Sequence, residues 1–218
     1  MIPVMRCASR RGWAGGDGAV RAFVAIPVPE AAVPGLADVQ GALEVGRLVP
    51  PENWHLTLAF LGDVSGETLE HLDEALRGLA IAPFEMHVRG VDLFGGRRPV
   101  LIHAAVERSE PLIRLRDKVR AAVRGAGIDL PRERFRPHVT LARFPARMSA
   151  LETQRIAGVL EGWGGFDAGT VPVGHFSLYR SHLHPGGVVY EVLAEYPLGQ
   201  HYSELRSLRF RISMKLDL

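Results

Sequence analysis

The sequence predicts an α+β fold on two observations. Four stretches with apolar residues at helical spacing are interleaved with shorter apolar, strand-like runs. Some of these strands follow one another through a hairpin-like connection, as at Gly95-Gly96-Arg97-Arg98-Pro99. Helices interleaved with hairpin-like strands favour an α+β arrangement over a parallel, doubly wound sheet.

The first half of the chain has the order strand, helix, strand, helix. Pro27 and Pro29 close the first strand, and Pro50-Pro51 marks the turn into the second. Ser65 is placed to cap the second helix, whose leucines recur at helical spacing. The predicted elements are a strand at 21–28, a helix at 30–43, a strand at 54–61 and a helix at 65–80.

The second half repeats this order and adds strands around it. A polar stretch at 131–137 leads into its central strand, and the turn Pro185-Gly186-Gly187 separates the last two strands. The predicted elements are strands at 84–91 and 100–106, a helix at 109–126, a strand at 138–144, a helix at 151–160, and strands at 174–182 and 188–198. The shared order suggests an old duplication that made two similar halves.

We expect three segments: a leader at 1–20, a two-lobed domain at 21–198, and a C-terminal tail at 199–218 with a further strand around 208–216. The 218 residues, 47% of them hydrophobic, are enough for one packed domain. The leader holds the single cysteine, Cys7, which excludes an intramolecular disulfide and a cysteine-based zinc cluster. Its arginines and glycines do not resemble a secretory signal, so we expect a disordered extension or a mis-assigned start.

Charge and hydropathy exclude several classes of protein. Basic residues exceed acidic ones by only 26 to 24, although nearly all of the basic residues are arginine. No apolar stretch approaches the roughly 20 residues that span a bilayer. There is no Gly-rich phosphate loop, so a nucleotide cofactor is unsupported. We expect a cytoplasmic monomer that needs no membrane and no cofactor.

Two tetrapeptides lie in strand-like runs 83 residues apart: His55-Leu56-Thr57-Leu58 and His138-Val139-Thr140-Leu141. Along a strand successive side chains point to opposite faces, so each His shares a face with the Thr two residues later. Random placement would give only about 0.2 His-x-Thr pairs in this composition. The repeat predicts two His-x-Thr strands that face one cleft.

Other interpretations of the histidines remain open. A lone strand histidine is most often a hydrogen-bonded core residue, and we assign His87 and His103 in this way. The near-match His175-Phe176-Ser177-Leu178 shows that strand patterning alone can produce the spacing. A duplication without function could also preserve both motifs. Zinc would need further ligands at interpretable spacing, and the isolated His182-x-His184 reads as a turn, so we expect no metal.

If both motifs face one cleft, their chemistry fits general acid–base catalysis at a phosphodiester. An unperturbed histidine titrates at about 6.5, so near neutral pH one imidazole can accept a proton while the other, as a cation, donates one. Water deprotonated by one histidine would attack phosphorus in line, and the other would protonate the departing oxygen. The threonine hydroxyls can donate hydrogen bonds to the non-bridging oxygens without adding negative charge.

Further segments around the motifs carry a resemblance to a known family. They are RAFVAI at 21–26, ENWHLTLAFLG at 52–62, RPHVTLAR at 136–143 and the stretch 181–190. With them the sequence resembles the two-histidine (2H) phosphoesterase superfamily, most closely its bacterial and archaeal RNA 2′,3′-cyclic phosphodiesterase branch, once called 2′-5′ RNA ligases. The resemblance covers about 21–198 and leaves the leader and tail outside.

The resemblance implies a bilobal α+β fold in which two mainly antiparallel sheets form a central cleft with helices outside. It implies that His55 is the proton donor and His138 the proton acceptor, with Thr57 and Thr140 binding phosphate. The implied reaction opens a terminal 2′,3′-cyclic phosphate of RNA to a 2′-phosphate, without a metal. Related activities on a small cyclic nucleotide, 2′-5′ RNA ligation, or non-catalytic binding of RNA ends are the alternatives.

Arg143 matches the arginine that commonly follows the second motif, which implies phosphate pairing. On a regular strand it would face away from His138, so either a bulge or a structural salt bridge is required. The arginines at 132, 134 and 136 either line the path of the RNA or solvate a loop. Three aromatic residues could stack a base or belong to the core: Trp54, Phe60 and Tyr179.

Overall fold

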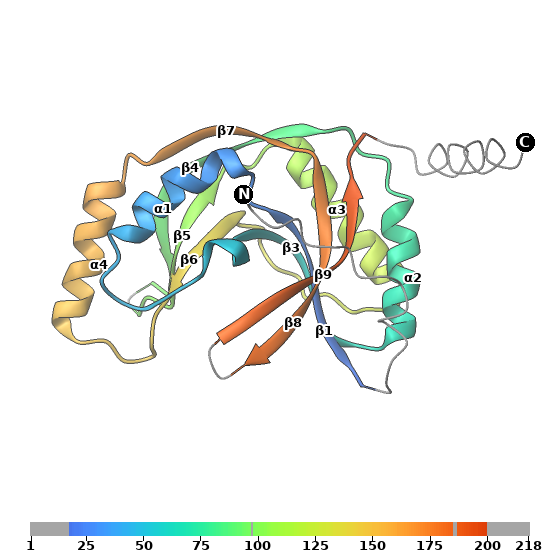
Figure 1. Cartoon of the computed structure of the whole chain (residues 1–218), viewed down its shortest axis with the longest axis horizontal. Helices are drawn as coiled ribbons and strands as arrows, with labels where there is room; N and C mark the ends of the chain where they lie inside the picture. Colours follow the sequence, from blue (N-terminus) through green and yellow to red (C-terminus); the bar gives the residue numbers. More distant parts are fainter. Residues whose placement is uncertain (1–17, 97, 185–186, 200–218) are drawn as a thin grey trace, which may run out of the picture.

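The computed structural model describes residues 18–96, 98–184 and 187–199, which form one curved antiparallel sheet with helices on its outer side (Figure 1). The predicted α+β class is confirmed. Most of the leader, the strand expected around 208–216 and the Pro185-Gly186 part of the last turn lie outside the described residues.

Nine strands form the sheet in the order β7-β4-β5-β6-β3-β1-β8-β9, with β2 beside β6. All of the strand pairs in the described part of the chain are antiparallel, which the hairpin-like connections predicted. The strands are β1 Val20–Pro27, β2 Arg47–Leu48, β3 His55–Val64, β4 Phe84–Phe94, β5 Leu101–Val106, β6 His138–Arg143, β7 Asp167–Val173, β8 His175–His184 and β9 Gly187–Pro197.

Four α-helices are present among the described residues, and serines cap three of them. The Oγ atoms of Ser65 and Ser109 accept hydrogen bonds from backbone amides of the first turns of α2 and α3. Ser149 and Glu152 form a capping box at the start of α4. The helices are α1 Val33–Gly41, α2 Gly66–Arg77, α3 Glu110–Gly125 and α4 Ala150–Trp163, with short 3₁₀ turns at Glu30–Ala32 and Pro51–Asn53.

The sheet divides into two lobes. In one half of the sheet α3 packs on β3 and α2 on β9, and in the other α4 packs on β4 and α1 on β6 and β7, while α3 also reaches β4 (Figure 1). The lobes meet where β3 pairs with β6 through Leu56 and Val139. The two expected sheets are therefore the halves of one continuous sheet, joined at the motif strands.

The core lies between the helices and the sheet. The leucines predicted to line one face of α2, Leu69, Leu72 and Leu76, are at most 1% exposed. Burial of a leucine side chain contributes about 1.5–3 kcal/mol, so the buried face of α2 adds to the stability of the fold. No helix in the described part of the chain is long and apolar enough to cross a membrane.

Two strands were missed by the sequence prediction. Strand β7 contains Gly169 and Pro172, which weaken a strand pattern, but it is an edge strand, where proline is tolerated because one side needs no partner. Strand β2 is only two residues long and forms by pairing with β6. Both owe their conformation to a neighbouring strand and not to a local pattern.

Candidate active site

The two motif strands are neighbours in the sheet, and their four polar side chains share one face. Leu56 lies opposite Val139, so the antiparallel register sets His55 across from Thr140 and Thr57 across from His138. The two apolar residues are fully buried, while the histidines and threonines are half-buried. Each histidine therefore lies beside the threonine of the other motif, on the face that turns away from the core.

Each motif strand also contains a β-bulge at the final leucine of its motif. Along β1 the partner changes from Ala59 to Thr57, which leaves Leu58 as the extra residue. Along β5 the partner changes from Ala142 to Thr140, which leaves Leu141 as the extra residue. A bulge shifts the following residues to the opposite face of the strand.

The bulges bring an aromatic residue and a cation to the face of the histidines. Phe60 and Arg143 each lie five positions after a motif histidine, and both are exposed. On a regular strand Arg143 would face away from His138, and the bulge at Leu141 brings it to the same face. No ion pair joins Arg143 to another described residue. Of the three aromatic candidates, Phe60 has 65% of its surface exposed, Trp54 is buried, and Tyr179 is half-buried and stacked on Phe23 at 5.0 Å.

A buried glutamine supports the second bulge. The Leu141 carbonyl accepts hydrogen bonds from the Val49 amide and from Gln40 Nε2, both at 2.8 Å. Gln40 Nε2 also donates to the Val49 carbonyl at 2.7 Å. The carbonyl of the bulge residue therefore has two hydrogen-bond donors, one from α1 and one from the residue that follows β2.

The backbone fixes the same tautomer of both motif histidines. Nδ1 of His55 lies 2.7 Å from the Asn53 carbonyl oxygen, and Nδ1 of His138 lies 2.7 Å from the Arg136 carbonyl oxygen. A carbonyl oxygen can only accept, so each Nδ1 carries a proton and donates it. Nε2 of each ring is left to accept or donate a proton at a bound ligand.

The surroundings of the two imidazoles differ. The His55 ring lies 4.8 Å from the Phe23 ring and 5.2 Å from the Tyr190 ring, between centroids. Burial lowers the pKa of His55 to about 4, and the nearby charges of His138 and Arg143 act in the same direction. Burial also lowers the pKa of His138, with Arg143 and Arg136 adding to the effect. Arg143 is therefore close enough to influence both rings, which are neutral at pH 7 in the free protein.

A third histidine adjoins the site, and the sequence interpretation did not foresee it there. His103 is buried as predicted, but its ring lies 5.1 Å from the His138 ring and 4.2 Å from the Phe94 ring. It pairs with Thr140 across β5 and β6, a relation that no pattern within its own strand reveals. The core assignment of His87 was wrong, because its partly exposed ring bonds Asp167 at 2.7 Å.

Part of the motif face opens into a cavity of about 320 Å³, which we call the catalytic cleft; His55, Thr140 and Arg143 share that face but are not among the residues that line the cavity. Thr57, Phe60 and His138 line it together with Phe94, Arg134 and Arg136, whereas Arg132 does not. The near-match at His175 differs from the motifs, since its Ser177 is fully buried and offers no hydroxyl beside the histidine. The described residues contain no group of three or more His, Cys, Asp or Glu side chains that could hold a metal ion.

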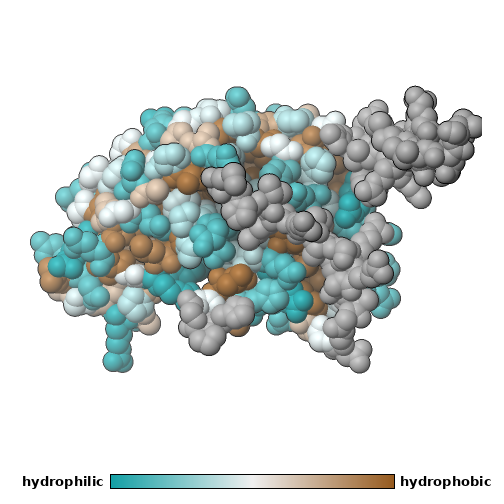
Figure 2. Space-filling view, in the orientation of Figure 1, coloured by the Kyte–Doolittle hydropathy of each residue, from teal (hydrophilic) through white to brown (hydrophobic). Residues whose placement is uncertain are grey.

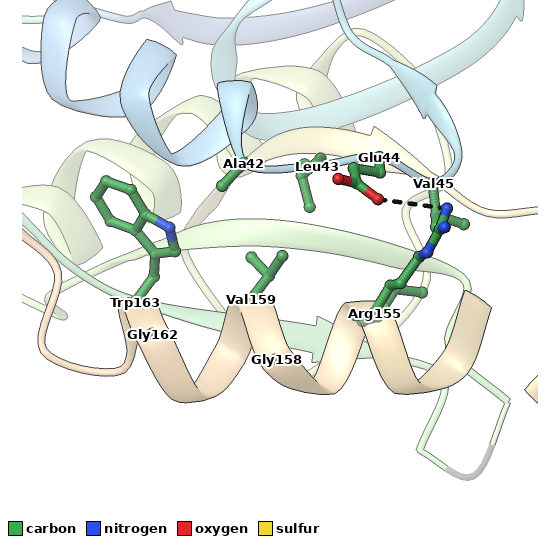
Figure 3. Close-up of a pocket in the computed structure, with 10 residues that line it drawn as sticks. Ala42, Leu43, Glu44, Val45, Arg155, Gly158, Val159, Gly162 and Trp163 are labelled. Carbon is green, nitrogen blue, oxygen red and sulfur yellow. Dashed lines mark ion pairs between the residues drawn. The ribbon is translucent and has the colours of Figure 1, made fainter. Parts of the chain in front are cut away.

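A separate groove lies beside α4, away from the motifs. Apolar side chains reach the surface there (Figure 2), and Trp163, Val159 and Leu43 line a cavity of about 280 Å³ (Figure 3). Arg155 closes one end through an ion pair with Glu44 at 3.3 Å. No histidine is found among the described residues that line this groove.

Comparisons with known proteins agree on one family. A family model described as the 2′-5′ RNA ligase superfamily matches residues 28–185. The chain is 35% identical to an RNA 2′,3′-cyclic phosphodiesterase of Thermus thermophilus over 85% of this chain and 94% of that protein. It is 29% identical to one of Bacillus subtilis over 74% of this chain and 87% of that protein.

Solved structures show the same fold. The crystal structure of Escherichia coli LigT complexed with 3′-AMP superposes with a TM-score of 0.68 at 26% identity, covering 84% of this chain and 99% of that one. A crystal structure of a Thermus thermophilus protein superposes with a TM-score of 0.66 at 31% identity, covering 82% of this chain and 97% of that one.

Proposed function

The chain belongs to the 2′-5′ RNA ligase superfamily, and we propose that it is an RNA 2′,3′-cyclic phosphodiesterase that opens a terminal cyclic phosphate to a 2′-phosphate. One observation carries the proposal: two His-x-Thr motifs lie side by side on adjacent strands, with Nδ1 of each histidine held by a backbone carbonyl. Two Nε2 atoms are thereby available to a single phosphate.

In the proposed reaction each histidine moves one proton. His138 Nε2 takes a proton from water as the water oxygen forms a bond to phosphorus. The bond from phosphorus to the 3′ oxygen breaks on the opposite side, and the protonated His55 gives its Nε2 proton to that oxygen. The products are a 2′-phosphate and a 3′-hydroxyl, and the reaction needs neither a metal ion nor a covalent intermediate.

The lowered pKa values fit these roles if binding of the substrate raises the pKa of the proton donor, His55, so that its ring becomes protonated. His138, with its pKa lowered by burial, is neutral at pH 7 and able to act as a base. His55, with a pKa of about 4 in the free protein, must gain a proton when the substrate binds. An anionic phosphate beside the ring favours the imidazolium form and raises the pKa, so binding itself prepares the acid.

The neighbouring side chains bind the substrate in this proposal. The hydroxyls of Thr57 and Thr140 donate to the non-bridging oxygens, where charge builds up in the transition state. The guanidinium of Arg143 pairs with the same phosphate. Phe60 offers an exposed ring on which the terminal base stacks.

The test uses an RNA oligonucleotide that ends in a 2′,3′-cyclic phosphate, incubated with the purified protein in EDTA. We expect conversion to a 2′-phosphate end, and a loss of activity of at least about 100-fold in His55→Ala and in His138→Ala. His175→Ala is the matched control, because this strand histidine has no accessible hydroxyl two residues later: its Ser177 is fully buried. Persistent activity in either motif variant would refute the assigned roles.

The same assay separates the alternatives. Small 2′,3′-cyclic nucleotides at matched concentration, and an acceptor RNA with a 5′-hydroxyl, report on the other activities that the resemblance allows. Preferential turnover of the small nucleotide, or formation of a joined RNA, would replace the proposed reaction. Tight binding of the oligonucleotide without turnover would indicate a protein that only recognises RNA ends.

A further inference from the structure

A second cavity of about 580 Å³ adjoins the catalytic cleft, and we call it the arginine pocket because three arginines line it. Arg108, Arg134 and Arg136 line it together with His103 and Asp92. We propose that this pocket binds the phosphodiester group that links the terminal nucleotide of the RNA to the nucleotide before it. The inference rests on the proposed function, which places the terminal phosphate in the catalytic cleft.

The position of the pocket fits the next phosphate of the same strand. Arg134 and Arg136 line both the arginine pocket and the catalytic cleft. The ring of His103, in the pocket, lies 5.1 Å from the ring of His138, in the cleft. An RNA strand whose end occupies the cleft can therefore leave it past arginines that the two cavities share.

The charge of the pocket is not balanced by the protein. Three guanidinium groups face one carboxylate, Asp92, which pairs with Arg136 at 3.2 Å. Arg108 and Arg134 form no ion pair with any residue that the structure describes. Guanidinium groups bind phosphate oxygens with two parallel hydrogen bonds, so a diester phosphate is the ligand that this set suits best.

The segment that carries two of these arginines is held in place from behind. Arg120, which is buried, donates to the Pro131 carbonyl at 2.6 Å and lies 3.6 Å from Glu133. Arg116, also buried, lies 3.6 Å from Glu133 and stacks on the Phe135 ring at 4.4 Å. Anchored in this way, the segment loses little freedom when it binds a ligand.

His103 adds a polar group to the wall of the pocket. Its Nδ1 is buried and has no hydrogen-bond partner among the described residues. A proton on Nδ1 would be a buried donor without an acceptor, which costs free energy. The neutral tautomer with its proton on Nε2 is therefore favoured. The remaining nitrogen is then a donor, which suits an acceptor such as a phosphate oxygen.

The experiment compares the binding of three product-like ligands, so that turnover is not needed. They are adenosine 2′-phosphate, the ApA dinucleotide with a 2′-phosphate end, and the same dinucleotide with a neutral methylphosphonate linkage. For the unaltered protein we expect the charged dinucleotide to bind about tenfold more tightly than the other two, since a charged hydrogen-bonded contact is worth roughly that factor. Isothermal titration calorimetry at fixed salt measures the three Kd values.

Two variants locate the contact. Arg108→Gln alters only the arginine pocket, and Arg108→Gln with Arg134→Gln removes both unpaired charges. We expect each to remove most of the advantage of the charged dinucleotide, while Arg108→Gln leaves the Kd of adenosine 2′-phosphate unchanged. Arg132→Gln is the matched control, an exposed arginine of the same segment that lines neither cavity.

Three results would overturn the inference. The first is that the methylphosphonate dinucleotide binds as tightly as the charged one. The second is that Arg108→Gln leaves the difference between their Kd values unchanged. The third is that Arg108→Gln weakens binding of the mononucleotide as much as binding of the dinucleotide. Hydrolysis of adenosine 2′,3′-cyclic phosphate is followed in parallel. Its absence would count against the proposed function, while the three Kd values still decide whether the pocket binds a diester phosphate.

Discussion

The two motif histidines have the same backbone restraint but different neighbours. Each donates through Nδ1 to the carbonyl two residues before it, so their Nε2 atoms are chemically alike. His55 lies among Phe23 and Tyr190, whereas His138 lies against Phe94 and His103. Identical side chains can take opposite proton-transfer roles only if their surroundings differ, and the structure supplies that difference.

The pKa values also depend on a shared cation, which makes Arg143 testable at the level of the residue. Its charge lowers the pKa of both motif histidines, so Arg143→Gln should raise both pKa values. The proposed contact to phosphate predicts a fall in kcat/KM of about 100-fold in the same variant. NMR titration of the imidazoles and steady-state kinetics measure the two effects.

Arg47→Gln is the control for this variant, because Arg47 pairs with Arg143 across β2 and β6 and is exposed, yet does not appear among the charges that shift either histidine. A loss of stability in Arg143→Gln without any change in the histidine pKa values would assign Arg143 a structural role instead.

At the scale of the element, the bulges decide which side chains share the face of the motif histidines. Without the extra residue at Leu141, Arg143 would point to the core face of β6. The carbonyl of the bulge residue Leu141 accepts hydrogen bonds from Gln40 Nε2 and from the Val49 amide. A helix that does not line the cleft, α1, therefore helps to set the geometry of the second motif.

Replacing this glutamine should weaken the protein without touching the substrate. Gln40→Met keeps the side-chain length but removes the donor, so the Val49 carbonyl loses its bond to the amide. We expect the free energy of unfolding to fall by about 1–3 kcal/mol, the usual cost of a buried polar group left unsatisfied. Urea unfolding followed by circular dichroism measures it.

Gln154→Met provides the comparison, since Gln154 is an exposed glutamine on α4 and its replacement should change the free energy of unfolding by less than about 0.5 kcal/mol. Equal effects of the two substitutions would show that the hydrogen bonds of Gln40 do not support the bulge.

At the scale of the molecule, joining the two lobes through one strand pair buries titratable groups at the centre of the sheet. Burial lowers the pKa values of His55 and His103 to about 4. The unfolded chain then binds more protons than the folded one between about pH 4 and 6.5, so stability falls as the pH is lowered through this range. The contribution is fully present above about pH 6.5.

His103→Phe should reduce this acid sensitivity. The aromatic side chain fills a similar volume and cannot be protonated, so at pH 4.5 the variant should lose ~2 kcal/mol less free energy of unfolding, relative to pH 7, than the unaltered protein. Urea unfolding at the two pH values gives the difference. His71→Phe, at an exposed helix position, should show no such gain; an unchanged acid sensitivity in His103→Phe would contradict the prediction.

Much of this protein could be read from local patterns. The α+β class, the four helices with the Ser65 cap, and the two motif strands follow from periodicity and turn residues, because these features depend on neighbours within one or two turns. The paired His-x-Thr motifs and their flanking segments also identified the family. Two occurrences of the rare His-x-Thr-Leu pattern were enough to select His55 and His138 as candidates.

Other features exist only because distant segments pair. The edge strand β7, the contact of His103 with His138, and the bulges that turn Phe60 and Arg143 to the face of the motif histidines all depend on strands far apart in the chain. The arginine pocket likewise joins β4, β5 and the segment before β6. The sequence by itself determined which residues are the candidates for the chemistry, whereas the tertiary structure decided which of them meet, since side-chain proximity across a sheet is set by register and not by spacing along a strand.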